Sequence, residues 1–150
     1  MNKKRVKLLA LILWMIIIFV FSQMPGNVSD ENSKFVIYIF NLLGLDLNSV
    51  FGSLANFAVR KGAHFTEYFI LYMLFLNVLR DRFTWPKALV FSLLGVFLYA
   101  CTDEFHQSFI PGRGPAFRDV LIDTSGGLVA LTAVYIRSCF KKRNKGDIVT

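Results

Sequence analysis

Long apolar runs alternate with short polar blocks along this chain. The first run, "LLALILWMIIIFVF", follows the basic block "NKKRVK" and ends at "SQMPG". Three later runs of similar character are bounded by charged or Pro/Gly-containing segments. Apolar stretches of about 20 residues form helices that cross the hydrocarbon core of a bilayer. The pattern therefore predicts an all-α, polytopic membrane protein with four transmembrane helices, over residues 7–23, 53–80, 86–109 and 116–140.

The four predicted helices are expected to belong to one domain. The chain has no internal repeat and no low-complexity tract, so residues 1–150 are assigned to a single membrane domain. Pro86 stands in the first turn of the third helix, where a proline is tolerated. The first run also has the outline of a signal peptide. Trp14 and Phe19 make it bulky towards the supposed cleavage site, which favours a retained helix.

The segment between the first two predicted spans is less regular. Its core, "SKFVIYIFNLLGLDL", is apolar for about twelve residues, which is too short for a crossing, and Gly44 and Asp46 end it. We expect a short interfacial or re-entrant helix over residues 33–45. Such a helix would equally serve as a lid over its neighbours, and the pattern leaves both arrangements open.

Composition agrees with a lipid environment and argues against nucleic acid as a partner. The chain is 55% hydrophobic and only 18% charged, whereas soluble domains are less apolar and more charged. The net charge of +7 would suit nucleic acid, but the basic residues sit in short blocks between apolar runs rather than among aromatics. The expected partner is therefore the lipid bilayer.

The distribution of basic residues predicts the orientation. With four crossings, twelve of the seventeen Lys and Arg residues lie on the side of the two termini. By the positive-inside rule both termini are cytoplasmic. Eight of the ten acidic residues and both histidines then fall in the outer half of the protein.

The second and third predicted helices carry polar faces at their outer ends. Arg60, His64 and Glu67 are separated by four and three residues, so they project within a narrow sector of the second helix. The third helix presents Asp103, His106 and Gln107 on one face, with Glu104 about 100° away.

The fourth helix adds a polar stripe at the same level. Asp119 and Asp123 are one turn apart, and the stripe continues through Gly126 and Ala130. Small residues permit close approach of another helix, so this stripe is expected to face protein rather than lipid. A homodimer formed through the stripe is an alternative use of it.

Ionisable groups at membrane depth usually point into a bundle or a wet cavity, so we expect one polar site open to the outside. The candidates for acid/base chemistry are His64, Glu67, Asp103 and His106. The candidates for ligand binding are Arg60, Lys61, Glu104, Gln107, Arg113, Arg118, Asp119 and Asp123. Arginines in such a site would hold a phosphate of a lipid headgroup bidentately.

Two other interpretations of the charged set remain open. Its four basic and five acidic residues would also neutralise one another as an ion-pair network that fixes helix packing. No cofactor is predicted, but a divalent metal is an alternative. His64 and Glu67 have a spacing found in helical ligand pairs. Four basic residues nearby would raise the free-energy cost of a cation.

Three blocks resemble the VanZ-like family of small bacterial membrane proteins, whose named member is associated with low-level teicoplanin resistance. They are "FSQMPG", "RKGAHFTEY" and "DEFHQSFIPGRGPAFRDVLIDTSGG", and the similarity runs from about Leu9 to Ile136. The first block departs from the family pattern at Gln23 and Met24. The family's characteristic positions would be Ser22, Pro25, Arg60, Lys61, His64, Glu67, Tyr68, Asp103, Glu104, Gln107, Arg113, Arg118, Asp119 and Gly126, and His106 and Asp123 also fit.

The resemblance implies a multi-pass protein of the bacterial cell membrane that is linked to glycopeptide susceptibility, and it implies no particular reaction. We expect binding or modification of cell-envelope material, such as a lipid-linked cell-wall precursor or a glycopeptide. The alternatives are an envelope hydrolase or transferase that uses the His/carboxylate cluster, and a structural membrane protein.

Overall fold

The protein is helical throughout the part of the chain that the computed structural model describes, residues 2–114 and 116–146. No strand occurs in those residues, and the predicted all-α class is confirmed. The elements are α1 (Lys3–Ser22), α2 (Gly26–Leu42), α3 (Leu47–Phe51), the short 3₁₀ turn η1 (Gly52–Leu54), α4 (Ala55–Leu79), α5 (Trp85–Gln107) and α6 (Phe117–Gly146).

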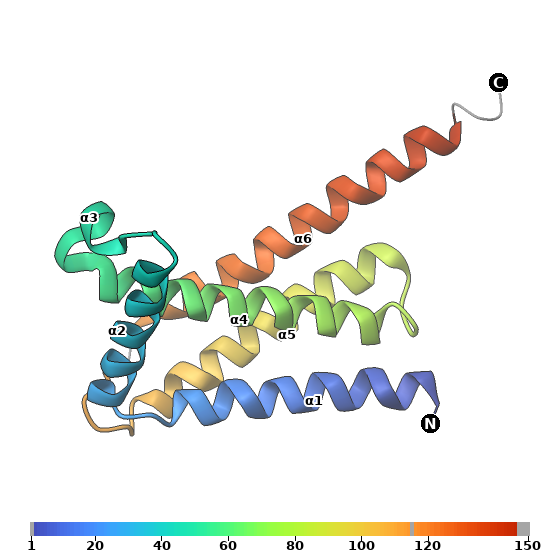
Figure 1. Ribbon diagram of the computed structural model, residues 1–150. Coiled ribbons are helices and arrows are strands. Elements are labelled where there is room, and N and C mark those ends of the chain that lie inside the picture. The colour runs from blue at the N-terminus through green and yellow to red at the C-terminus, as the bar shows by residue number, and fades with distance from the viewer. Residues whose placement is uncertain (1, 115, 147–150) are drawn as a thin grey trace.

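Within the described residues, four segments are long and apolar enough to cross a membrane, as predicted. They are Lys3–Ser22, Leu47–Leu79, Trp85–Gln107 and Phe117–Lys141. Figure 1 shows that both termini and the α4–α5 turn lie towards one end of the bundle. The opposite end, where α1 and α5 finish and α4 and α6 begin, is called the polar end below.

Helix α4 is the central element, because it contacts α1, α2, α5 and α6. Tyr68, Leu71 and Tyr72 on α4 are completely buried. The crossing with α6 is close, since a Cβ added to Gly126 would collide with the carbonyl oxygen of Phe65. Ala130, one turn further along α6, is also fully buried. The small-residue stripe therefore faces protein, as predicted, but α4 of the same chain fills it, so it is not open to a second copy.

Two long-range hydrogen bonds attach the middle of α1 to the rest of the bundle. The indole Nε1 of Trp14 donates to the backbone oxygen of Glu67 at 3.0 Å. The hydroxyl of Tyr99 donates to the backbone oxygen of Met15 at 2.6 Å. Amphipathic rings of this kind bury an apolar body while their polar atom finds a partner. Helix α1 is thereby held against α4 and α5 at about its midpoint.

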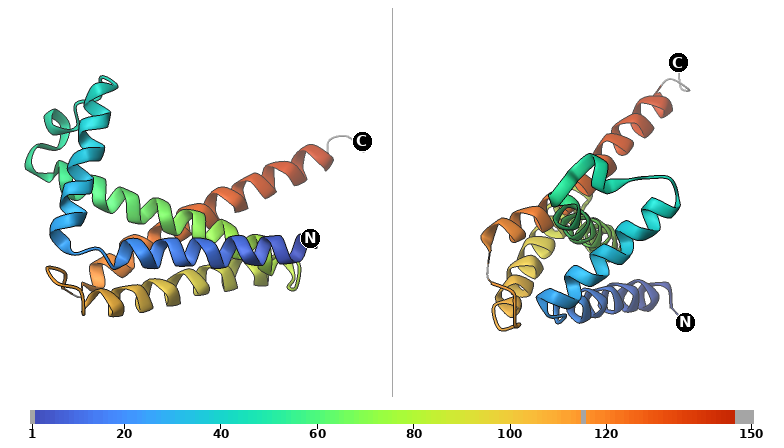
Figure 2. Two further views of the ribbon diagram at one scale, coloured as in Figure 1. Left: turned by 60° about the horizontal axis from the view of Figure 1, so that its bottom comes forward. Right: turned by 60° about the vertical axis from the view of Figure 1, so that its left-hand side comes forward.

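The segment before α4 differs from the prediction of one short helix over residues 33–45. Helix α2 begins at Gly26 and runs to Leu42, and a second short helix, α3, follows it. The polar stretch "GNVSDEN" precedes the helix predicted over residues 33–45, yet it forms the first two turns of α2. Helix α2 packs on α4 and lies across the polar end, so the lid arrangement is the one observed (Figures 1 and 2).

The start of α2 is fixed to the turn between α5 and α6. The backbone nitrogen of Gly26 donates to the carbonyl oxygen of Pro111 at 3.2 Å. A Cβ at Gly26 would collide with the carbonyl of Gly112, and Gly112 itself has a φ of +74°, in the left-handed region that glycine adopts without strain. Two glycines thus permit direct backbone contact at this point.

Candidate functional site

A cavity of about 250 Å³ lies at the polar end, and it is called the main cavity below. Helices α1, α2, α4 and α5 and the α5–α6 turn all contribute to its lining. The ionisable side chains that line it are Arg60, His64, Glu67, Asp103 and Arg113. The predicted polar faces of α4 and α5 and the turn that carries Arg113 contribute to this lining, whereas Asp119 and Asp123 of α6 do not line the main cavity.

A smaller side cavity of about 130 Å³ adjoins the main cavity. Its lining includes Lys61, Gln107 and Asp119. Arg60, His64 and Arg113 line both spaces, so they stand between the two cavities. The spacing of α4 explains this placement, because residues three or four apart share one helix face.

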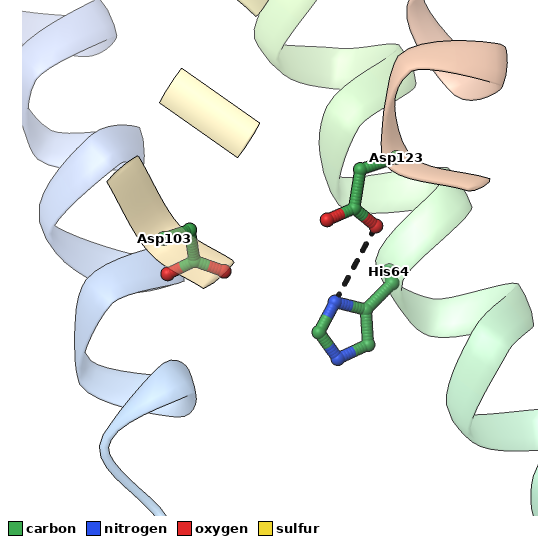
Figure 3. Close-up of side chains that lie close together, drawn as sticks. All are labelled: His64, Asp103 and Asp123. Carbon is green, nitrogen blue, oxygen red and sulfur yellow. Dashed lines mark ion pairs between the residues drawn. The ribbon is translucent and has the colours of Figure 1, made fainter. Parts of the chain in front are cut away.

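His64, Asp103 and Asp123 form a compact cluster contributed by α4, α5 and α6 (Figure 3). One ligand atom from each lies within 4.8 Å of the other two. His64 Nδ1 is 3.5 Å from Asp123 Oδ1. Asp103 Oδ2 accepts a hydrogen bond of 3.0 Å from Gln107 Nε2, which fixes that carboxylate. The predicted pair of His64 and Glu67 lines the same cavity, but Glu67 does not belong to this cluster.

The carboxylates of the cluster are buried and incompletely satisfied. Asp103 is 4% exposed and Asp123 is 3% exposed. Asp103 Oδ1, Asp123 Oδ1 and His64 Nδ1 each lack a hydrogen-bond partner among the described residues. Buried polar atoms are nearly always paired in native proteins, so an exception marks a place where something else binds or where strain is stored.

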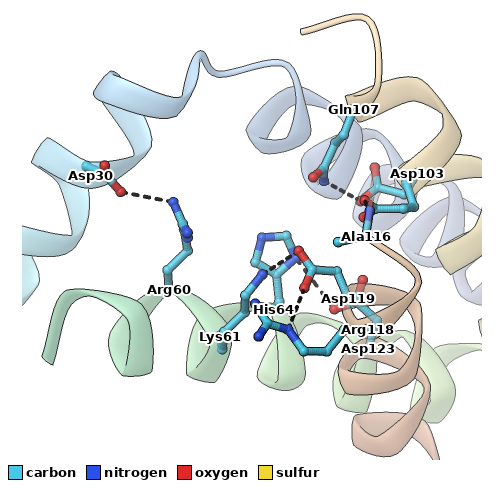
Figure 4. A network of polar contacts seen from close by, with 11 residues as sticks. Asp30, Arg60, Lys61, His64, Asp103, Gln107, Ala116, Arg118, Asp119 and Asp123 are labelled. Carbon is cyan, nitrogen blue, oxygen red and sulfur yellow. Dashed lines mark hydrogen bonds and ion pairs between the residues drawn. The ribbon is translucent and has the colours of Figure 1, made fainter. Parts of the chain in front are cut away.

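The neighbouring cations are directed to other acids (Figure 4). Arg60 Nη1 lies 2.9 Å from Asp30 Oδ1 on α2. Lys61 Nζ lies 2.5 Å from Asp119 Oδ2. The alternative of a self-neutralising set of four basic and five acidic residues is met only in part, by the pairs of Lys61 and Arg118 with Asp119. Arg60 is paired with an acid outside that set, while Asp103 and Asp123 pair with no Lys or Arg in the described chain.

Arg118 is placed differently from the other arginines. Its side chain is 68% exposed, and its Nε lies 3.9 Å from Asp119 Oδ1. Its guanidinium sits over the ring of Phe57, 5.1 Å from the centroid. It lines neither cavity. Although the sequence grouped Arg118 with the ligand-binding candidates, the structure directs it away from the main cavity.

Glu104 and His106 also lie outside both cavities. Glu104 Oε1 accepts a 2.5 Å hydrogen bond from the backbone nitrogen of Ala116, just before α6 begins. The ring of His106 packs on Phe19, with 4.7 Å between centroids. These contacts fix the α5–α6 connection and the end of α1, so both residues have evident packing roles.

Arg113 is presented by the turn between α5 and α6. Its backbone nitrogen donates to the carbonyl oxygen of Ile110 at 3.1 Å, and its side chain lines both cavities. Burial, and then the positive charge of Arg60, lower the pKa of the Arg113 guanidinium from its usual value. Two arginines that repel each other across a partly dry space favour an anion between them.

Sequence reasoning missed the contribution of α2 to the main cavity. Ser29, Asn32 and Ser33 line it, together with Val36. Their spacing of three, four and seven residues from Ser29 is the mark of one helix face, and it would have identified them had α2 been expected to begin at Gly26. Ser22 at the end of α1 also lines the cavity, and its buried hydroxyl has no partner in the described residues.

An apolar groove of about 600 Å³ runs beside the main cavity, between α2, α3 and α4. Phe40, Phe51 and Ile70 are among its lining residues. The groove and the main cavity share lining residues on α2 and α4, namely Val36, Val59, Ala63 and Glu67. A charged space and an apolar groove are therefore contiguous at the polar end.

The described residues form four helices long and apolar enough to cross a membrane, and three of them, α1, α4 and α5, line the charged main cavity together with α2 and the α5–α6 turn; these features define a small polytopic membrane protein. A family model described as VanZ/LLP1 matches residues 7–138, most of the chain. The chain belongs to this family, which confirms the resemblance found in its three sequence blocks. No significant match was found among curated proteins or among solved structures.

Proposed function

We propose that this protein binds anionic, lipid-linked material of the cell envelope at the outer leaflet. One observation carries the proposal: the main cavity, with Arg60 and Arg113, is contiguous with the apolar groove. A phosphorylated headgroup would occupy the cavity, and its acyl or polyprenyl chain would lie in the groove. Family membership adds the link to glycopeptide susceptibility, because teicoplanin resistance is associated with the named member.

The chemistry of the cavity suits a phosphate or pyrophosphate. Arginine presents a planar fork that matches two phosphate oxygens at once, and such charge-assisted bonds are stronger than neutral ones. Arg60 approaches from α4 and Arg113 from the α5–α6 turn, so the two guanidinium groups reach the space from different elements. The side chains of Ser29, Asn32 and Ser33 add hydrogen-bonding groups for a sugar or an amide.

The proposed outer location follows from the orientation argued from the basic residues. The polar end is opposite to the end that carries both termini (Figure 1). If the termini are cytoplasmic, the main cavity opens at the level of the outer headgroups. A cysteine introduced at exposed Lys34 should then react with a membrane-impermeant thiol reagent in intact cells, in a background without Cys101 and Cys139.

Binding of a polyprenyl pyrophosphate to the purified protein tests the proposal, with the matching polyprenol as the uncharged control ligand. Arg113→Ala should weaken pyrophosphate binding at least about tenfold, since each bidentate charge-assisted contact contributes about 1.5–3 kcal/mol. Lys34→Ala removes an exposed cation from α2 and should change nothing. Equal affinity for the two ligands, or wild-type binding by a folded Arg113→Ala protein, would refute the anion site.

Catalysis on the bound material is a second candidate, favoured by the position of His64 between two buried carboxylates. A histidine next to a carboxylate is a common general base, with its ring oriented by the acid. His64→Gln should abolish turnover of a lipid-linked precursor while leaving the melting temperature unchanged. If wild-type protein that binds the precursor shows no turnover, the proposal reduces to binding alone.

A further inference from the structure

The cluster of His64, Asp103 and Asp123 carries two carboxylates, of which Asp103 lines the main cavity. Asp103 and Asp123 are almost fully buried. Asp103 Oδ1 has no hydrogen-bond partner in the described residues, and Asp123 Oδ1 has only His64 Nδ1 near it, at 3.5 Å. Lys61 and Arg60, the nearest basic residues on α4, are bonded to Asp119 and Asp30 instead. An isolated carboxylate in an apolar medium is so costly that it needs a cation or a proton beside it.

We propose that His64, Asp103 and Asp123 bind a divalent metal ion. Their ligand atoms lie within 4.8 Å of one another in the ligand-free arrangement. Ligands at about 2.1 Å from a common ion are separated by about 3 to 4.2 Å, so small side-chain movements complete the site. One imidazole nitrogen and two carboxylate oxygens form a ligand set typical of first-row transition ions such as Zn²⁺ and Mn²⁺.

The surroundings of the cluster have the features of a metal site. Gln107 donates to Asp103 Oδ2 and leaves Oδ1 free, which is the way a neighbouring hydrogen bond orients a ligating carboxylate. The three residues come from α4, α5 and α6, so rigid helices hold each ligand. Asp123 and His64 already approach to 3.5 Å. Three protein ligands leave coordination positions for water or for a ligand in the main cavity.

The sequence suggests that four nearby basic residues raise the free-energy cost of binding a cation. In the structure, two of them do not act against a cation at the cluster. Arg118 is exposed and lines neither cavity, and Lys61 is neutralised by Asp119. Arg113 remains as a facing cation across the cavity. An anionic group that lies between Arg113 and the metal would contact positive charge on both sides.

The metal proposal goes beyond lipid binding and does not rest on it. With an ion in place, His64 is a ligand, and its nitrogen is no longer a free base. The competing explanation of the unpaired oxygens is a proton shared by Asp103 and Asp123, as happens when two carboxylates cannot both ionise. A shared proton predicts no metal affinity.

The proposal is tested by measuring how much metal the full-length protein binds. The protein is purified in detergent, stripped with chelator and reloaded with Zn²⁺ or Mn²⁺. One equivalent per chain should bind, and loading should raise the melting temperature. Asp103→Asn and Asp123→Asn should each reduce affinity at least about tenfold, as should Gln107→Ala through the orientation of Asp103. Glu31→Gln changes an exposed acid on α2 and should bind one equivalent normally.

Two results would overturn the metal site. One is the absence of stoichiometric binding by folded wild-type protein. The other is binding that both folded aspartate variants retain unchanged. If neither variant folds, the nitrogen hyperfine coupling of Mn²⁺ bound to wild-type protein decides, because His64 is the nitrogen ligand of the proposed set and the two aspartates supply only oxygen; absence of this coupling would overturn the site. Arg113→Ala should keep the metal while losing the pyrophosphate lipid, so the two proposals fail separately.

Discussion

The two ends of the helix bundle use charge in opposite ways. At the end with the termini, Lys7 Nζ pairs with Asp81 Oδ2 at 2.6 Å near the surface. A cavity of about 630 Å³ also lies there, and its ionisable lining residues are Arg80, Arg137 and Lys141, all basic. The polar end instead buries acids beside a histidine and arginines in a smaller space.

The contrast shows that cavity size does not identify the functional end. A basic rim is common at the membrane boundary of polytopic proteins, and exposed pairs contribute little to stability. Buried acids with unpaired oxygens have no such general explanation, because desolvation opposes them. The mixture of opposite charges in a buried place therefore distinguishes the candidate site.

The largest expected effect comes from separating the helices that bring the acids together. Gly126→Ala should lower the free energy of unfolding by about 1–3 kcal/mol, because the added Cβ collides with the backbone of Phe65 on α4. Gly62→Ala is the matched control, since nothing lies within 4 Å of its Cβ and helix propensity should make it neutral or slightly stabilising. Chemical unfolding in detergent measures both, and equal stability of the two variants would contradict the close crossing.

A Glu104 substitution tests whether this buried acid acts only in packing or also in ligand binding. Glu104→Ala should lower the free energy of unfolding by about 1–2 kcal/mol, because it leaves the Ala116 amide without its acceptor. Affinity for the polyprenyl pyrophosphate should stay at the wild-type value, since Glu104 lines neither cavity. A loss of lipid affinity at unchanged stability would return Glu104 to the binding site.

Replacement of the two helix arginines compares a cavity residue with an exposed one. Arg60→Gln should weaken binding of the pyrophosphate lipid about tenfold, because one charge-assisted contact is lost. Arg118→Gln should change affinity less than twofold, since its side chain is 68% exposed and turned onto Phe57. Titration with the lipid in detergent measures both, and equal losses would favour the grouping made from the sequence.

The smallest effect is expected at the opposite end. The hydrogen bond from Lys7 holds the pKa of Asp81 below its usual value. An acid whose pKa is lower in the folded than in the unfolded protein stabilises the fold above its unfolded pKa, here near 4. This contribution is lost as the pH falls through the folded pKa. Lys7→Gln should therefore lower the melting temperature slightly at pH 6, and this difference should shrink as the pH falls below about 4. A pH-independent difference would show that the pair has no role.

Much of the fold could be predicted because bilayer crossing imposes length and hydropathy on a helix. The spans ending near Leu79 and beginning at Trp85 were placed within a few residues by the polar turn between them. Helix α2 was placed poorly, since its first two turns are polar and gain their stability from contact with Pro111 and Gly112 of a distant turn. Tertiary contact of this kind leaves no local signal.

The candidate site could be predicted as a set but not as an arrangement. Helical spacing correctly grouped Arg60, His64 and Glu67 on one face. It could not show that Arg60 would pair with Asp30, because α2 was not expected to reach it. It also could not show that Arg113 lines the cavities while Arg118 is exposed. The direction of a side chain near a Pro/Gly turn depends on the backbone conformation of the turn.

The contact between Gly26 and the α5–α6 turn joins the roof of the cavity to one of its arginines. Helix α2 carries Ser29 and Asn32, and the turn carries Arg113, only one residue beyond Gly112. Because the two backbones touch and share a hydrogen bond, a movement of α2 away from the turn breaks that bond unless the turn moves with it. Admission of a bulky ligand from the membrane would therefore move α2 and Arg113 together. The cavity would open and its contacts with an anion would weaken in the same movement.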